Sequence, residues 1–259
     1  MTRYYCSGFD GNDAFGHGLG EMFQRELTDT KSIVFIPGGA EKIEKARNKQ
    51  IPVFIEHFKR AGICFERMGL ITPDLSGQEA RTMIRNASFV MLLGGNPFQQ
   101  KELCDRLDLS GVLQKFDGVM AGFSAGAMLM SRYIIVTPCS EEYPEFRIEE
   151  GLNLDNISVY PHNNTSEESY PEALAAGGEI YQRRDLVQVA EEYGEFYLLQ
   201  DNARENGRTD VSIIKSSDGE LAYYIENEGK LWKAAKDGVS LIAAGRGKQQ
   251  EKGSLVRFL

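Results

Sequence analysis

Short apolar runs alternate with amphipathic segments through the first half of the chain. Runs such as "SIVFIPGG" and "SFVMLLGGNP" are rich in β-branched and large apolar residues and stop at glycine and proline, a pattern typical of buried strands. Between them the apolar positions recur at helical spacing, and Ser76 stands three residues before Glu79, the spacing of a helix-capping box. The predicted strands are 32–39, 63–70, 88–97 and 117–123, and the predicted helices between them are 41–61, 76–87 and about 98–107.

This alternation predicts an α/β fold with a mostly parallel sheet and helices on both faces. In such sheets ligands bind beyond the carboxyl ends of the strands, where this chain has three glycine-rich turns, "PGGA", "GGNP" and "GFSAGA". The tail from Thr209 has short alternating runs around an Asp-Gly pair, which predicts a β-hairpin. We therefore expect a main domain over residues 1–204 and a small β appendage over 205–259 that packs on it.

The composition narrows the classes of protein to consider. The 259 residues are 42% hydrophobic and 26% charged, as in an ordinary soluble globular protein, and the net charge of −9 disfavours binding to nucleic acid or anionic membranes. No apolar run approaches the ~20 residues of a membrane span, and the first residues lack the apolar core of a signal peptide. The cysteines form no C-x-x-C pair, so we expect reduced thiols in a cytoplasmic protein and no metal site. They are Cys6, Cys64, Cys104 and Cys139.

A single serine stands among small residues in "GFSAGA". Gly122, Ser124 and Gly126 fit the G-x-S-x-G pattern of a nucleophile elbow, in which a sharp strand-to-helix turn tolerates only small neighbours. At such a turn the backbone N–H of Ala125 can contribute to an oxyanion hole. The alternative is that Ser124 only caps the following helix, with the glycines allowing close packing.

A nucleophilic serine needs a base, and the chain has three histidines. His162 follows a predicted strand, 156–161, at the same edge of the sheet as Ser124, so it is the first candidate. His17 lies in a glycine-rich loop and is the second candidate. His57 lies in an apolar helical stretch and is expected to be structural.

Three stretches in this order, "FVMLLGGNPFQ", "MAGFSAGAML" and "ISVYPHN", resemble the peptidase E and cyanophycinase family of serine peptidases, over roughly residues 30–202. The resemblance implies a class I glutamine-amidotransferase-like fold with Ser124 as nucleophile and His162 as general base. It also implies that the N–H groups of Gly95 and Ala125 bind the oxyanion. The expected activity is hydrolysis of a peptide or another small amide, without a metal or cofactor.

The third member of the triad departs from the family pattern. The family has an acidic residue shortly after the elbow helix and its strand, where this chain reads "VTPCSEEYPEF". A carboxylate is needed because the imidazole must keep one tautomer and then carry a positive charge. Glu141 and Glu142 are the nearest candidates, and the sequence does not choose between them.

A second departure concerns substrate choice. In the aspartyl dipeptidases of the family, an arginine downstream of the histidine binds the acidic side chain of the substrate. Here Glu179 aligns near that position, while Arg183 and Arg184 are several residues away and are interpreted as helix surface. We therefore expect weak activity on Asp-X dipeptides and a preference for neutral or basic residues.

Two other functions share these sequence features. An α/β-hydrolase-type esterase also has the G-x-S-x-G pattern. A non-catalytic protein could keep the same scaffold and bind a small metabolite, because a fold does not fix a function. The oligomeric state, including a homodimer, is left open by the sequence.

Overall fold

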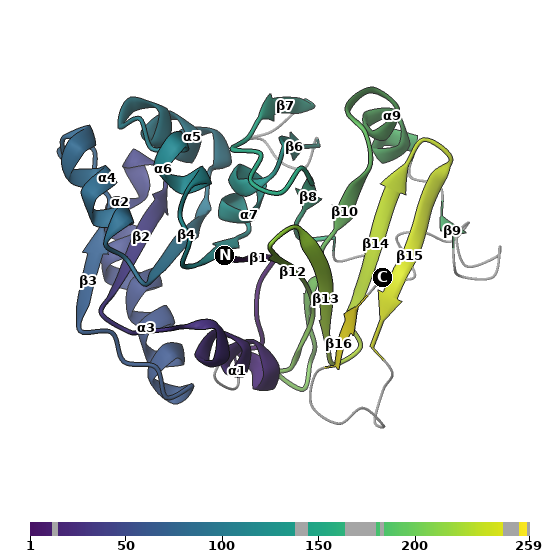
Figure 1. Ribbon diagram of the computed structural model, residues 1–259. Helices are drawn as coiled ribbons and strands as arrows, with labels where there is room; N and C mark the ends of the chain where they lie inside the picture. The colour runs from purple at the N-terminus through teal and green to yellow at the C-terminus, as the bar shows by residue number, and fades with distance from the viewer. Residues whose placement is uncertain (12–14, 138–144, 164–179, 182–183, 246–253, 258–259) are drawn as a thin grey trace.

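A computed structural model describes residues 1–11, 15–137, 145–163, 180–181, 184–245 and 254–257 of the chain. Its main sheet is built on parallel strands in the spatial order β3–β2–β4–β5–β1 (Figure 1). Because their carboxyl ends lie at one edge, the turns that follow these strands meet there. The strands are β1 (Thr2–Cys6), β2 (Ser32–Gly38), β3 (Arg67–Leu70), β4 (Phe89–Gly95) and β5 (Val119–Phe123).

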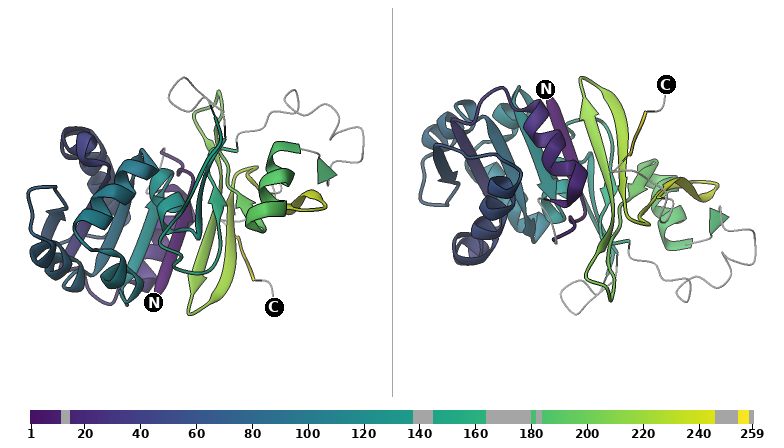
Figure 2. Two further views of the ribbon diagram at one scale, coloured as in Figure 1. Left: turned by 90° about the horizontal axis from the view of Figure 1, so that it is seen from above. Right: turned by 90° about the horizontal axis from the view of Figure 1, so that it is seen from below.

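Helices cover both faces of these strands, as Figure 2 shows from two sides. Along β4, Val90 and Leu92 belong to one apolar core and Phe89 and Met91 to the other, so the strand is buried on both faces. This arrangement confirms the predicted α/β class. One face packs against α1 (Gly16–Glu26) and α3 (Ile51–Arg60), and the other against α4 (Gly77–Arg85), α5 (Pro97–Arg106), α6 (Ser110–Gln114) and α7 (Ala125–Met130).

The chain does not enter α3 directly. The predicted helix over 41–61 is divided into a 3₁₀ turn η1 (Ala40–Lys42), one turn of α-helix α2 (Ile43–Lys45) and a π-helical turn η2 (Ala46–Gln50), and α3 begins at the next residue. The predicted capping box at the start of α4 is confirmed, since Ser76 accepts from the Glu79 N–H and Glu79 accepts from the Ser76 N–H.

The main sheet continues past β1 with antiparallel strands. β12 (Thr209–Ser217) pairs with β1, and β13 (Glu220–Glu226) pairs with β12. Asp218 and Gly219 join them with φ values of 49° and 87°, the positive values that a tight hairpin turn requires. The predicted hairpin is thus confirmed. β11 (Asp201–Ala203) pairs with the first residues of β12, which β1 does not reach, and β16 (Ser254–Arg257) forms the edge beside β13.

A second sheet lies beside the antiparallel part of the first (Figures 1 and 2). Its core gathers Leu198, Trp232 and Val239 against Leu186 of α9 (Arg184–Tyr193). The tail therefore supplies strands to both sheets and not only a hairpin, while the division at residue 204 stays a prediction. The strands are β8 (Val159–Tyr160), β9 (Ile180–Tyr181), β10 (Phe196–Leu198), β14 (Lys230–Ala235) and β15 (Gly238–Ala244), and β6 (Tyr133–Val136) pairs separately with β7 (Arg147–Glu150).

Several strands differ from the sequence analysis. The predicted strands include neither β1 nor β7, and β3 is shorter than the apolar run that predicts it. β1 has no simple apolar pattern because its first residues, Thr2 and Arg3, are polar and yet buried. In the part of the chain that the structure describes, no helix is both long and apolar enough to cross a membrane.

Candidate active site

Ser124 occupies a strained turn between β5 and α7. Its φ of 52° and ψ of −112° lie outside the conformations that a non-glycine residue prefers. Small neighbours make the turn fit: a Cβ at Gly126 would lie 2.2 Å from the Leu92 carbonyl oxygen, and one at Gly122 would lie 2.6 Å from the Ala127 nitrogen. These contacts are the close approach that the nucleophile-elbow pattern predicts.

The backbone of Ser124 is held on both sides, while its side chain is turned away from the helix. Its N–H donates to the Cys6 carbonyl at the end of β1 (2.8 Å), and its carbonyl accepts the N–H of Met128 in α7 (3.1 Å). The hydroxyl makes no capping hydrogen bond to α7. It lies instead 2.6 Å from Nε2 of His162, so the alternative in which Ser124 only caps the helix is wrong.

His162 links the serine to a carboxylate. Its Nδ1 lies 2.8 Å from Oδ2 of Asp201, the first residue of β11, so serine, imidazole and carboxylate form one hydrogen-bonded chain. The imidazole is half exposed and the carboxylate is only 16% exposed. Gly8 makes room for this carboxylate, because a Cβ there would lie 2.8 Å from Oδ2.

β1 also positions the histidine. Ser7 directly follows β1, and its Oγ accepts the backbone N–H of His162 at 2.6 Å and lies 3.4 Å from Nδ1. His162 has a φ of 58°, an uncommon value for a residue other than glycine. The hydrogen bond that the His162 N–H donates to the buried Ser7 side chain helps to hold this conformation.

The glycine pair at the end of β4 lies against the nucleophile. A Cβ at Gly94 would lie 3.5 Å from the Ser124 Cβ, so only a small gap separates this backbone from the serine. Gly95 has a φ of 156° and packs back to back with Gly38, whose carbonyl oxygen would lie 2.7 Å from a Cβ at Gly95. Gly94, the residue before Gly95, thus lies beside the serine, and the buried Ala125 directly follows the serine in the chain.

Asp201 was missed by the sequence analysis. The sequence "EFYLLQD", residues 195–201, has the composition of a strand and ends at Asp201, so the available signal was an acidic residue where a strand stops. Its distance of 39 positions from His162 hides the pairing, since the two meet only because β8 and β10 pair in parallel. The candidates Glu141 and Glu142, and also Glu179 and Arg183, lie outside the described residues.

The remaining histidines differ from His162. His57 is buried in α3 among the rings of Phe9 and Phe15, and its Nδ1 accepts the Phe15 N–H at 3.3 Å, which confirms a structural role. His17 belongs to α1 and Arg184 begins α9, but their side chains are outside the described part of the chain.

Other chemistry at this edge of the sheet is limited. Cys6 lies next to the site, but burial raises the pKa of its thiol well above the ordinary value and so disfavours the thiolate. Within the described residues, no group of three or more His, Cys, Asp or Glu side chains is placed to hold a metal. A cavity of about 980 Å³ lies at the opposite, amino end of β1 and β5, lined in part by Thr2, Val119 and Lys215.

Comparison with known proteins places the chain in a family. The model of peptidase family S51 matches residues 6–197, well over half of the chain, which therefore belongs to this family of serine peptidases. Asp201 lies just beyond the matched range. This result favours the peptidase interpretation over the α/β-hydrolase alternative. Among curated proteins, none matches the chain.

Solved structures show the same fold at low sequence identity. A peptidase from an acI-B1 Actinobacterium superposes with a TM-score of 0.62 at 16% identity, covering 99% of this chain and 96% of its own. A Listeria monocytogenes EGD-e protein assigned by name to peptidase E gives a TM-score of 0.56 at 16% identity, covering 86% of this chain and 97% of its own. These similarities confirm the predicted fold.

Proposed function

We propose that the protein hydrolyses small peptides with a Ser124–His162–Asp201 triad. The observation that carries the proposal is the continuous hydrogen-bonded chain from the serine Oγ through both imidazole nitrogens to the carboxylate, 2.6 Å and 2.8 Å long at its two links. Asp201 takes the role that the sequence analysis sought at Glu141 or Glu142. Membership of peptidase family S51 supports the hydrolysis of a peptide bond.

In this mechanism Ser124 Oγ attacks the carbonyl carbon of the scissile amide while Nε2 of His162 removes its proton. Asp201 holds the tautomer that carries hydrogen on Nδ1 and stabilises the imidazolium that forms. The imidazolium then protonates the leaving amine, and an acyl-enzyme remains. Water, deprotonated by the same imidazole, hydrolyses the ester and restores the serine.

The tetrahedral oxyanion is assigned to the backbone N–H groups of Gly95 and Ala125. Support comes from the contact of Gly94 with Ser124 and from the position of Ala125 directly after the nucleophile. Such donors stabilise charge where it develops in the transition state, and the loss of one costs about 2.7–4 kcal/mol.

A two-part experiment tests the proposal. The protein is treated with a fluorophosphonate probe and, separately, with a series of X-Leu dipeptides that includes Asp-Leu, Ala-Leu and Lys-Leu. We expect labelling and the cleavage of at least one dipeptide, both lost in Ser124→Ala and His162→Ala at an unchanged melting temperature. The losses should not add in the double variant, because triad members act as a unit. A Ser124→Ala protein that still cleaves the dipeptide would contradict the proposal.

A further inference from the structure

The peptide group between Gly94 and Gly95 lies at the end of β4, where Gly95 pairs with Gly38 of β2. A peptide plane flanked by two glycines turns easily, because neither residue has a Cβ to restrict its dihedral angles. In a trans peptide the carbonyl and the N–H point in opposite directions. The orientation of the Gly94 carbonyl therefore decides where the N–H of Gly95 points.

One side chain reaches this carbonyl from another element. Nε2 of Gln50 donates to the Gly94 oxygen at 3.0 Å. On the far side of the same turn, the Asn96 N–H donates to the Gly38 carbonyl at 2.9 Å, and Oδ1 of Asn96 caps α5. The turn is thus held at Gly94 and at Asn96, on either side of the Gly95 N–H.

Gln50 has a backbone setting that suits this role. It is the last residue of the π-helical turn η2, and such turns, which are rare, recur at functional sites. Its Oε1 is buried and has no hydrogen-bond partner among the residues that the structure describes. Within that part of the chain, the interaction of its side-chain amide is therefore the hydrogen bond to the Gly94 carbonyl.

We infer that Gln50 is a positioning residue for the oxyanion hole: by holding the Gly94 carbonyl on the side of η2, it turns the Gly95 N–H toward Ser124. Gln50 touches no reacting atom and acts through the peptide plane. The inference rests on the proposed function, because an oxyanion forms only if Ser124 attacks an acyl group. Gln50 would thus contribute to the oxyanion hole although it lies outside the three glycine-rich turns.

Two substitutions remove the donor and keep the length of the side chain. Gln50→Met has no polar group, and Gln50→Glu presents only acceptors to the carbonyl at neutral pH. Asn48→Ala is the matched control, because Asn48 lies in the same π-helical turn and its amide bonds only to the exposed Glu44 among the described residues. All are compared with the wild type on its best X-Leu dipeptide and with the fluorophosphonate probe.

We expect both Gln50 variants to lower kcat about 10- to 100-fold with KM within about threefold, since a misdirected donor loses part of the 100- to 1,000-fold effect of a missing one. The rate of fluorophosphonate labelling should fall in parallel, because that reaction also develops charge on an oxygen beside the serine. Asn48→Ala should behave as the wild type. If Gln50 had a purely structural role, its substitution would lower the melting temperature. We therefore measure kcat well below the melting temperature of each variant.

The outcomes separate this inference from the proposed function. If Ser124→Ala is inactive but both Gln50 variants keep kcat and labelling within about twofold of the wild type, the positioning role is wrong and the triad stands. If only KM or only the melting temperature changes, the positioning role is also wrong. If the wild type neither reacts with the probe nor cleaves any dipeptide, the proposed function fails and this inference fails with it.

Discussion

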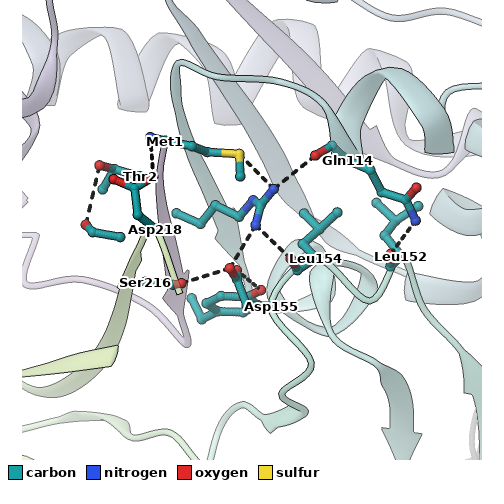
Figure 3. A network of polar contacts seen from close by, with 11 residues as sticks. Met1, Thr2, Gln114, Leu152, Leu154, Asp155, Ser216 and Asp218 are labelled. Atoms are coloured by element: carbon teal, nitrogen blue, oxygen red, sulfur yellow. Dashed lines mark hydrogen bonds and ion pairs between the residues drawn. The ribbon is translucent and has the colours of Figure 1, made fainter. Parts of the chain in front are cut away.

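Two aspartates lie near opposite ends of strand β1 and have different surroundings. At the amino end, Asp155 accepts from Arg3 Nη1 (2.8 Å), Tyr5 OH (2.6 Å) and Ser216 Oγ (2.8 Å), and the Arg3–Asp155 pair is almost fully buried (Figure 3). Arg3 also donates to the carbonyls of Leu154 and Gln114, which fixes the guanidinium from several sides. At the carboxyl end, Asp201 meets the half-exposed His162, whose backbone is held by Ser7.

The contrast distinguishes an aspartate that stabilises the fold from one that is proposed to act in catalysis. The groups that donate to Asp155 are a guanidinium, a phenol and an alcohol, and burial together with the charge of Asp155 raises the pKa of Tyr5 well above its ordinary value. At Asp201 the partner is an imidazole, the side chain whose proton moves most readily near neutral pH. The buried network stabilises one arrangement, while the half-exposed imidazole beside Asp201 can take up charge in the proposed reaction.

The largest effect is expected at the carboxyl end. Asp201→Asn should lower kcat about 10³- to 10⁴-fold, because an amide cannot stabilise the imidazolium and can hold the wrong tautomer. The melting temperature should change little, since the substitution keeps the shape of the side chain. Dipeptide hydrolysis and thermal unfolding measure the two effects.

Asp218→Asn is the control for this substitution. Asp218 is an exposed aspartate in the β12–β13 turn that pairs with the N-terminal amine. It should retain full activity. If Asp201→Asn stays within tenfold of the wild type, the carboxylate of the triad lies elsewhere, and Glu141 and Glu142 become the candidates to test.

The second effect is expected in stability. Asp155→Asn should lower the free energy of unfolding by about 3–5 kcal/mol, because it leaves the buried Arg3 guanidinium without its counter-charge. Urea unfolding measures the loss, and kcat should be unchanged where the variant is still folded. Replacing both partners, Arg3→Met with Asp155→Leu, should recover part of the loss, whereas an Asp155→Asn protein as stable as the wild type would show that the network is dispensable.

How well each end of β1 can be predicted from the sequence depends on how far apart along the chain its interacting residues lie. The elbow at Ser124 is recognisable because local sterics dictate it: Gly122 and Gly126 are small for contacts with α7 and β4 that any sequence with this turn must make. The alternating strands and helices are also local, and the α/β class follows from them. His162 was found because it directly follows a predicted strand, but the expectation that this strand belongs to the serine's sheet was wrong: β8 lies in the second sheet, and His162 reaches Ser124 from there.

The rest depends on contacts that periodicity does not encode. β1 has polar residues at its start because Arg3 is satisfied by Asp155, a partner about 150 positions away. Asp201 reaches His162 only through the pairing of β8 with β10 and of β11 with β12. Gln50 likewise bonds to Gly94 across 44 positions. In each case the residue can be seen in the sequence, but the local pattern does not indicate which distant residue it contacts.

A smaller effect distinguishes the two tyrosines of β1. Tyr5→Phe should cost about 1.5–3 kcal/mol of unfolding free energy, because a buried charged group loses a hydrogen bond. Tyr4→Phe is the matched control: its hydroxyl is also buried, and none of the described residues bonds to it. It should be neutral or slightly stabilising in urea unfolding. Equal losses in the two variants would mean that the bond to Asp155 adds nothing to burial.

The smallest effect concerns Ser7, which extends the comparison to the histidine itself. Ser7→Ala removes the acceptor of the His162 N–H, so the imidazole should lose part of its alignment toward Ser124. We expect kcat to fall about tenfold, which corresponds to about 1.4 kcal/mol in the activation free energy, with KM unchanged.

Ser131→Ala supplies the matched control for Ser7. Its hydroxyl is equally buried and accepts the backbone N–H of Val159 in β8 at 3.1 Å, but it lies away from the imidazole. Both substitutions leave a backbone N–H without its acceptor, so both should lower the melting temperature by similar amounts. Only Ser7→Ala should lower kcat. If kcat falls equally in both variants, Ser7 only stabilises the fold and does not align the imidazole. The functional difference between the two ends of β1 then depends on Asp201 alone.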